Sequence, residues 1–203
     1  DNQQFIIERN FAMAHARLSI IDLSVASNQP FVSADGRFTL VFNGEIFNYK
    51  ALRDELKSKG HNFKSDGDVE VLLNLYKEFG KECLNKLNGF FAFFLYDTQE
   101  ETFFAARDRF GVKPFYYYQD ENYFACSSEL RSLKHITGSH EIDKAALFAY
   151  LQLTYVPERT TILKGIHKLE PGHCVIIKDK NVDHPAYAQQ LEPFAQLVRN
   201  TFK

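Results

Sequence analysis

The sequence has few cysteines, little net charge and no long hydrophobic run. Its 203 residues include only three cysteines, at widely separated positions: Cys83, Cys126 and Cys174. Such sparse thiols fit a reducing compartment, and we expect them to be buried and free. Neither these cysteines nor the seven histidines are spaced like metal ligands, so the sequence predicts no metal site.

Charge and hydrophobicity also argue against two classes of partner. The net charge is -2 at pH 7, and lysine and arginine are scattered among acidic residues, which argues against a nucleic-acid-binding protein. No apolar stretch reaches membrane-spanning length and no signal peptide opens the sequence as given, so we expect a cytoplasmic protein that binds no membrane. Tryptophan is absent, but 20 phenylalanines and 10 tyrosines are typical of a β-rich core.

The stretch around Asn43 and Gly44 carries the clearest functional signal. Residues 38–42 are apolar, β-branched or aromatic, which predicts a buried strand. An Asn-Gly pair commonly forms a hairpin turn, but residues 45–49 lead into a helical pattern and not into a second strand. We therefore predict that the strand ends at Asn43-Gly44. The Asn amide and the Gly N–H would then be two adjacent donors for a negatively charged substrate oxygen.

The rest of the pattern predicts a mixture of helices and antiparallel strands. We expect helices at residues 49–60, 68–80, 81–88, 129–135 and 143–153, the first with Asn48 as its N-cap. We expect strands at residues 90–96, 102–106, 114–118 and 123–126, forming one antiparallel meander covered on both faces, and another at 174–178. Residues 187–202 resemble the beginning of a further helix.

Three charged positions allow both a structural and a functional interpretation. Arg17 is either an ordinary surface arginine or a bidentate clamp for a carboxylate, held at a strand end. Asp68 is either the cap of the second helix or an anchor for a substrate ammonium group. The Arg107-Asp108-Arg109 cluster is better explained as a buried structural ion pair than as a catalytic group.

Four motifs, in this order, resemble the glutaminase domain of glutamine-hydrolysing asparagine synthetases. They are residues 15–24 (HARLSIIDLS), 42–49 (FNGEIFNY), 106–117 (ARDRFGVKPFYY) and 127–129 (SSE), and residues 155–157 and 168–173 extend the similarity. That domain is a class II glutamine amidotransferase, one of the N-terminal-nucleophile hydrolases. The resemblance implies an α+β fold, a four-layer α/β/β/α sandwich. It covers residues 15–174, and its specificity lies in the order and number of the motifs.

The resemblance also implies a role for each matching residue. Arg17 would bind the α-carboxylate of glutamine, and Glu45 and Asp68 would bind its α-ammonium group. The Asn43 side chain and the Gly44 N–H would form the catalytic oxyanion hole. Asp68 is preferred over Asp66 because the residues that follow it, Val-Glu-Val-Leu, fix the register.

The sequence departs from the family at the nucleophile, which in the family is an N-terminal cysteine whose α-amino group acts as general base. This sequence begins with Asp1, and its first cysteine, Cys83, lies within an expected helix. We therefore expect the nucleophile in a segment upstream of Asp1. Residues 1–178 would form the glutaminase domain, and residues 179–203 a linker and the start of an ATP-binding synthetase domain.

In the family, the ammonia passes to a synthetase domain of the same chain, which makes asparagine from aspartate. The glutaminase domain itself would need no cofactor, whereas ATP and magnesium would serve the synthetase domain. The resemblance also allows a homodimer. Alternatives are an amidotransferase with a different acceptor, a glutamine-binding module without the N-terminal cysteine, and an aromatic-rich structural sandwich with no ligand. The natural N-terminal residue distinguishes the enzyme from the binding module.

Overall fold

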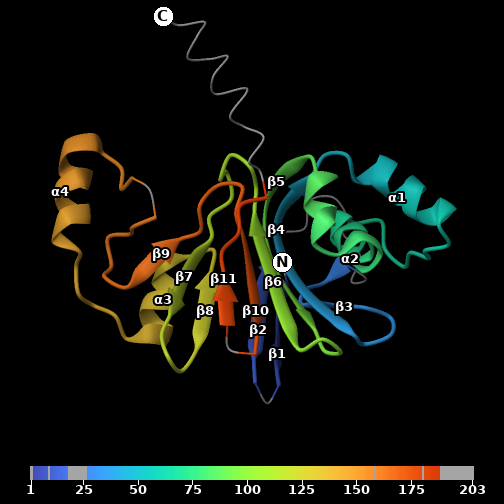
Figure 1. The fold of residues 1–203 in the computed structure, drawn as a ribbon, viewed down its shortest axis with the longest axis horizontal. Helices are drawn as coiled ribbons and strands as arrows, with labels where there is room; N and C mark the ends of the chain where they lie inside the picture. The colour runs from blue at the N-terminus through green and yellow to red at the C-terminus, as the bar shows by residue number, and fades with distance from the viewer. Residues whose placement is uncertain (1, 9, 18–26, 158, 180, 188–203) are drawn as a thin grey trace, which may run out of the picture.

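The chain folds into two β-sheets enclosed by helices (Figure 1). The computed structural model describes residues 2–8, 10–17, 27–157, 159–179 and 181–187. The larger sheet has six strands, in the order β11 (Asn181–Asp183), β10 (Cys174–Lys178), β6 (Thr102–Arg107), β5 (Gly89–Asp97), β4 (Phe38–Ile46) and β3 (Phe31–Val32). The smaller sheet has three, in the order β8 (Phe124–Ser127), β7 (Tyr116–Gln119) and β9 (Ile166–Lys168). A two-stranded ribbon pairs β1 (Asn2–Ile7) with β2 (Ala12–Arg17).

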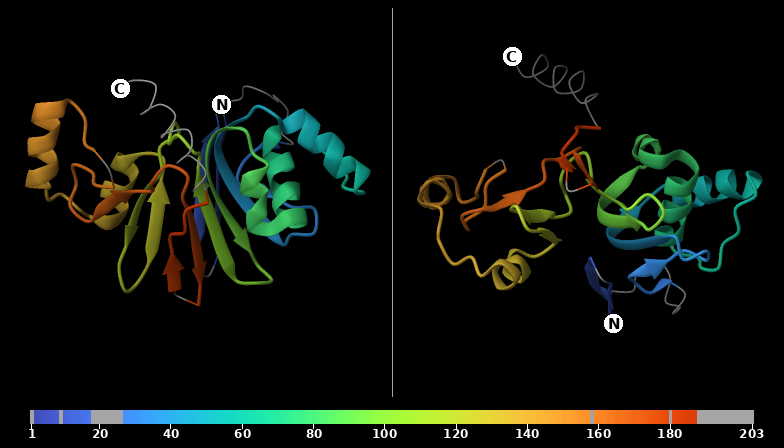
Figure 2. Two further views of the ribbon diagram at one scale, coloured as in Figure 1. Left: turned by 45° about the horizontal axis from the view of Figure 1, so that its top comes forward. Right: turned by 60° about the horizontal axis from the view of Figure 1, so that its bottom comes forward.

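Helices lie on the outer side of each sheet, and the views in Figure 2 show the two groups on opposite sides of the molecule. On the larger sheet lie α1 (Tyr49–Ser58), α2 (Asp68–Phe79) and the short 3-10 helix η2 (Gly80–Asn85). On the other side lie α3 (Leu130–Thr137) and α4 (Lys144–Leu153). Five segments were predicted to be helical, and all five are, although residues 80–85 form 3-10 rather than α-helix.

Three clusters of buried side chains fill the interfaces between these four layers. The first joins α1 and α2 to the larger sheet and includes Leu56 and Phe104. The second lies between the two sheets and includes Phe115. The third packs Leu133 of α3 against Ile166 of β9. The arrangement confirms the predicted α/β/β/α sandwich.

Strand β5 shows how one strand contributes to two of these interfaces. Phe91, Phe93 and Leu95 belong to the cluster on the helical side, whereas Ala92 and Phe94 belong to the cluster between the sheets. Successive strand side chains point to opposite faces of a sheet, so a strand covered on both faces is hydrophobic throughout. The continuous apolar run predicted a strand that is covered on both faces, and β5 is covered on both faces.

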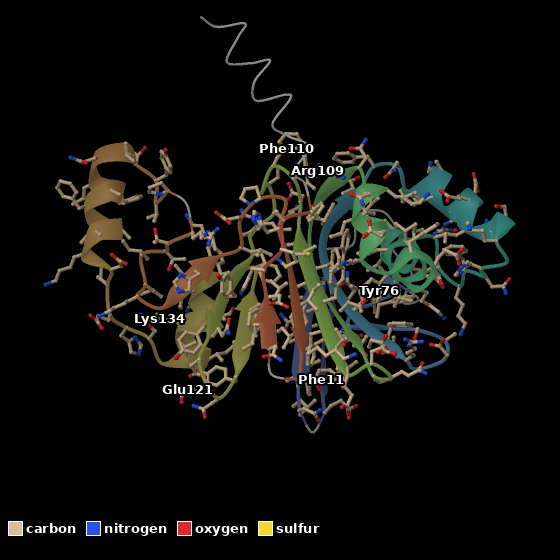
Figure 3. The ribbon with its side chains drawn as sticks, viewed as in Figure 1. Phe11, Tyr76, Arg109, Phe110, Glu121 and Lys134 are labelled. Atoms are coloured by element: carbon tan, nitrogen blue, oxygen red, sulfur yellow. The ribbon has the colours of Figure 1, made fainter. Side chains whose placement is uncertain are left out.

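Aromatic rings fill much of the interface between α2 and the larger sheet. Tyr76 of α2, labelled in Figure 3, stacks on Phe104 with 5.1 Å between ring centroids and meets Phe38 edge-on at 5.9 Å. Such ring pairs stabilise a core by about 0.5–1.5 kcal/mol beyond the area that they bury. The abundance of phenylalanine and tyrosine is thus explained by a β-rich core, as the composition predicts.

Strand β4 continues to Ile46 and does not end at Asn43-Gly44, so that prediction is wrong. Over all nine of its residues it pairs with β5, with Asn43 opposite Ala92 and Gly44 opposite Phe91. The pair also forms no hairpin turn. Pairing with β5 overrides the local turn preference because glycine, which lacks a Cβ, lets the two backbones approach closely here.

The chain changes sheets after β6, so the predicted single meander is also wrong. β5 and β6 pair in the larger sheet, whereas β7 and β8 pair in the smaller one. The fully buried Asp108 holds the crossing loop together. Its carboxylate accepts the N–H groups of Phe110, Val112 and Lys113 at 3.0–3.1 Å and that of Phe91 at 3.3 Å. Periodicity in the sequence predicts each strand but does not indicate which sheet a strand joins.

The Arg107-Asp108-Arg109 cluster has a structural role, but the predicted ion pair is wrong. The Arg107 guanidinium donates to three carbonyl groups in the loops that precede β7 and β10, at 2.6–2.8 Å. Arg109, labelled at the edge of the molecule in Figure 3, donates to the carbonyl groups of Leu84 and Leu87. The three side chains thus bind backbone groups instead of one another, because the tight loops leave backbone groups unpaired.

The C-terminal part of the described chain extends the larger sheet. β11 pairs with β10, so the sheet continues beyond residue 178, where we expected a linker to begin. The expected helix at residues 187–202 lies outside the described residues, apart from Tyr187. No described helix is long and apolar enough to cross a membrane. Within the same residues, no group of three or more His, Cys, Asp or Glu side chains could hold a metal ion.

Candidate active site

One edge of β4 faces a cavity. In an antiparallel strand the N–H and C=O of one residue point to the same side, and successive residues alternate. β3 covers only the first part of the edge that faces away from β5. Further along this edge, side chains accept the backbone N–H groups: Gln29 Oε1 accepts from Phe42 at 2.6 Å, and Asp68 Oδ2 accepts from Ile46 at 3.0 Å.

Gly44 lies midway between Phe42 and Ile46, so its N–H points to the same edge. Within the described part of the chain, no side chain or loop carbonyl accepts from this N–H. Phe42 and Ile46 bury their side chains on the helical face of the sheet. Asn43 and Glu45 therefore present theirs on the opposite face. Both line a cavity of about 730 Å³, together with Gly44.

The other walls of this cavity come from four distant parts of the chain, one of which is the loop before β3 with Ser27 and Gln29. The start of α2 contributes Asp68, and the β1–β2 ribbon contributes His15. A further wall is polar and is formed by the loop before β7, the end of β8 and the start of α3. It consists of Lys113, Ser127, Ser128, Glu129 and Ser132. The cavity thus combines backbone and amide donors with several carboxylates.

Position 44 accepts only glycine. Its φ is +156°, and a Cβ built there would overlap the carbonyl oxygen of Phe90 and lie 2.7 Å from the Cα of Phe91. Atoms cannot approach so closely without moving, so a side chain at this position would push β4 and β5 apart. The glycine therefore permits the strand pairing and, at the same time, the exposure of its N–H to the cavity.

Asp68 faces the cavity from the first turn of α2. The N-cap of α2 is Gly67, so Asp68 is not the cap of this helix, which was one of the two interpretations that the sequence allowed. The residue is 7% exposed, and its carboxylate accepts the Ile46 N–H. Burial raises the pKa of this carboxyl, and the nearby Glu45 carboxylate adds to the effect. Asp66, the alternative from the sequence, instead points to solvent and pairs with Arg53 at 2.8 Å.

Arg17 lies at a strand end, as predicted. It is the last residue of β2 and pairs with Asn2 of β1. Its side chain lies outside the described atoms, so its interaction with a carboxylate stays a prediction. β2 reaches the cavity through His15, two residues earlier.

Two cavity residues that the sequence did not single out hold the edge of β4. Gln29 and His15 both bind the backbone of Phe42, next to Asn43. His15 belongs to the first family motif, and Gln29 precedes Pro30 in a loop. The sequence could have drawn attention to His15 through the motif, but no local pattern connects either residue with Phe42.

The three cysteines do not supply a nucleophile to the cavity. Cys83 and Cys174 are buried, as expected, and Cys126 is partly buried beside a smaller hollow between the sheets. Burial raises the pKa of Cys83 to about 12 and that of Cys174 to about 11. Burial also raises the pKa of Cys126. Thiols with such pKa values are protonated at neutral pH and are poor nucleophiles.

Known proteins are similar to this chain in sequence and in fold. A family model described as a glutamine amidotransferase domain matches residues 1–188. Two glutamine-hydrolysing asparagine synthetases of Bacillus subtilis (strain 168), numbered 1 and 3, are 40% and 36% identical over 180 and 210 residues. The matches cover 88% and 97% of this chain but only 28% and 34% of those relatives, so the chain spans about a third of their length or less.

Among solved structures, the glutamine phosphoribosylpyrophosphate amidotransferase of Bacillus subtilis superposes with a TM-score of 0.64. It is 22% identical, and the match covers 88% of this chain and 35% of that one. At this identity the likeness concerns the fold alone. It agrees with the four-layer sandwich described above.

Proposed function

Because this chain belongs to the glutamine amidotransferase family, we propose that its cavity binds glutamine and hydrolyses the side-chain amide to glutamate and ammonia. One observation carries the proposal: the Gly44 N–H points into the cavity beside the Asn43 amide, with the Glu45 and Asp68 carboxylates close by. Two donors suit the oxyanion of a tetrahedral intermediate. Two carboxylates suit an α-ammonium group, and Arg17 would bind the α-carboxylate.

We propose that the nucleophile is a cysteine upstream of Asp1, whose own α-amino group takes the thiol proton. The thiolate would attack the amide carbon, and the carbonyl oxygen would become an oxyanion held by Asn43 and Gly44. When this intermediate collapses, the C–N bond breaks, the proton passes to the leaving ammonia and a thioester remains. Water would then hydrolyse the thioester to glutamate. The cavity of about 730 Å³ has room for glutamine and for the end of a preceding segment.

The rest of the proposal concerns the fate of the ammonia, the cofactors, the location and the oligomeric state of the protein to which this domain would belong. By analogy with the Bacillus subtilis relatives, the ammonia would pass to an ATP- and magnesium-dependent synthetase domain of the same chain that makes asparagine from aspartate. The glutaminase domain itself would need no cofactor. The sparse cysteines support a cytoplasmic location, and a homodimer is part of the same proposal. A different ammonia acceptor is the main alternative.

The first test is the N-terminus of the native protein. Intact mass and N-terminal sequencing should reveal a mature chain that begins with cysteine upstream of Asp1, and this protein should release ammonia from glutamine. A mature chain that begins with any other residue would exclude hydrolysis by this mechanism. If that chain still bound glutamine, the cavity would belong to a non-catalytic binding module.

Asp68→Asn should raise KM for glutamine about 10- to 100-fold, because a charge-assisted hydrogen bond to the ammonium group is worth about 1.5–3 kcal/mol. The raised pKa of Asp68 also predicts a pH dependence. The carboxylate loses its charge as the pH falls through this raised pKa. As the pH is lowered, KM should therefore begin to rise at a higher pH than it would if Asp68 had the pKa of an ordinary aspartate. Steady-state kinetics across the acid range measures both effects.

Asp66→Asn is the matched control, since it makes the same chemical change at a solvent-facing carboxylate two residues away. This control should leave KM and its pH dependence unchanged. If instead Asp66→Asn raised KM and Asp68→Asn did not, the assignment of the ammonium site would be wrong.

A further inference from the structure

Two side chains replace a neighbouring strand next to the proposed oxyanion hole. Gln29 is 7% exposed, and its Oε1 accepts the Phe42 N–H at 2.6 Å. His15 Nε2 lies 3.1 Å from the Phe42 carbonyl oxygen, and because a carbonyl can only accept, Nε2 is the donor. Both backbone groups of one residue are therefore held, by a side chain from β2 and by one from the loop before β3.

This contact completes a row of anchors along one edge of β4. The Ser33 hydroxyl accepts the Phe38 N–H at 2.9 Å, β3 pairs with Leu40, and Asp68 accepts the Ile46 N–H at 3.0 Å. Among the described residues, Gly44 is thus the position in this row without an anchor, with an anchored residue two positions before it and another two positions after it. Without such anchors β4 would be held only by its pairing with β5, and the backbone groups along its other edge would lack partners to fix their direction.

We infer that Gln29 and His15 are positioning residues, which hold the Phe42 backbone so that the Asn43 amide and the Gly44 N–H meet the reacting amide group. This inference rests on the function proposed above. His15 binds the carbonyl of the peptide group between Phe42 and Asn43, and the next peptide group carries the Gly44 N–H. A displacement of about 1 Å at a reacting centre can lower a rate about 10²-fold. Neither side chain needs to touch the substrate for this effect.

Gln29→Leu tests the inference, since leucine fills most of the space without providing an acceptor. In the full-length enzyme we expect kcat for glutamine hydrolysis to fall about 10- to 100-fold, with KM changed less than about threefold because the ammonium and carboxylate contacts remain. Ser33→Ala is the matched control. Ser33 is also 7% exposed and also accepts a β4 N–H, but it lies outside the cavity. A fall in kcat as large for Ser33→Ala as for Gln29→Leu would overturn the inference.

His15 permits a test that separates positioning from proton transfer. Glutamine at this position keeps a neutral N–H donor but cannot act as an acid or base in the catalytic pH range. We expect His15→Gln to keep kcat within about fivefold and to leave the shape of the pH–rate profile unchanged, whereas His15→Leu should lose about tenfold or more. If His15→Gln were as inactive as His15→Leu and lost one limb of the profile, His15 would be a proton-transfer residue.

A measurement without turnover separates this inference from the proposed function. Hydrogen exchange in the full chain should show the Phe42 amide protected in the wild type and exchanging at least tenfold faster in Gln29→Leu, with Ser33→Ala unchanged at this amide. Slow exchange at Phe42 in Gln29→Leu would overturn the inference even in an active enzyme. Conversely, a wild type without glutaminase activity but with this exchange pattern would refute the proposed function and leave the anchoring intact.

Discussion

Replacing Gly44 by alanine is expected to lower kcat for glutamine hydrolysis at least 10²–10³-fold, the loss typical of one missing oxyanion donor. The added Cβ would overlap the Phe90 carbonyl oxygen and crowd the Phe91 Cα, so β4 and β5 would have to separate. Separation turns the Gly44 N–H away from the substrate. It should also lower the free energy of unfolding by about 1–3 kcal/mol, as overpacking does. Ammonia release and urea unfolding measure the two effects.

Gly36→Ala is the control for the conformational part of this effect. Gly36 also has a positive φ, +71°, but a Cβ there would have no neighbour within 4 Å. This variant should lose about 1–2 kcal/mol of stability from the left-handed backbone and keep its kcat. If Gly44→Ala lost stability but retained kcat within tenfold of the wild type, the Gly44 N–H would not be an oxyanion donor.

Asn43→Ala should lower kcat about 10²–10³-fold, with KM changed only a few-fold, because its amide is proposed to act on charge that develops only in the transition state. Asn43→Asp should be at least as damaging, since a carboxylate of the same shape would repel the oxyanion. Steady-state kinetics on both variants distinguishes a donor from a residue that only fills space. If the aspartate variant retained the wild-type kcat, Asn43 would not be a donor.

Asn48 provides a matched amide with a purely structural environment. Asn48 is the N-cap residue of α1, as expected, but its side chain makes no capping hydrogen bond. Instead the side chain donates to the Lys86 carbonyl at 2.9 Å and accepts the Asn88 N–H at 3.0 Å. Asn48→Ala should therefore cost about 1 kcal/mol or more of stability. We expect it to leave kcat unchanged, so that comparison with Asn43→Ala isolates the chemical role of the amide.

Sequence periodicity predicted most individual elements, because each depends on local spacing. The apolar run before Asp97 predicted β5, and the spacing of Leu72, Leu75 and Tyr76 predicted α2. The same reasoning failed where pairing partners decide the outcome. The Asn43-Gly44 pair has a strong turn preference, but β5 holds it extended. Local patterns likewise could not show that the loop at Asp108 carries the chain from one sheet to the other.

The sequence by itself determined which strands are apolar on both faces and which face of each helix is apolar. It also determined that Asn43, Gly44 and Glu45 are adjacent. All of these features are fixed by neighbours along the chain. The tertiary structure alone decided which distant groups meet them. Asp68 is 22 residues from Ile46, and His15 is 27 residues from Phe42, yet both bind the edge of β4. They meet there because β3 is short and leaves backbone groups on that edge, and a backbone group without a partner costs too much free energy to remain unpaired away from water.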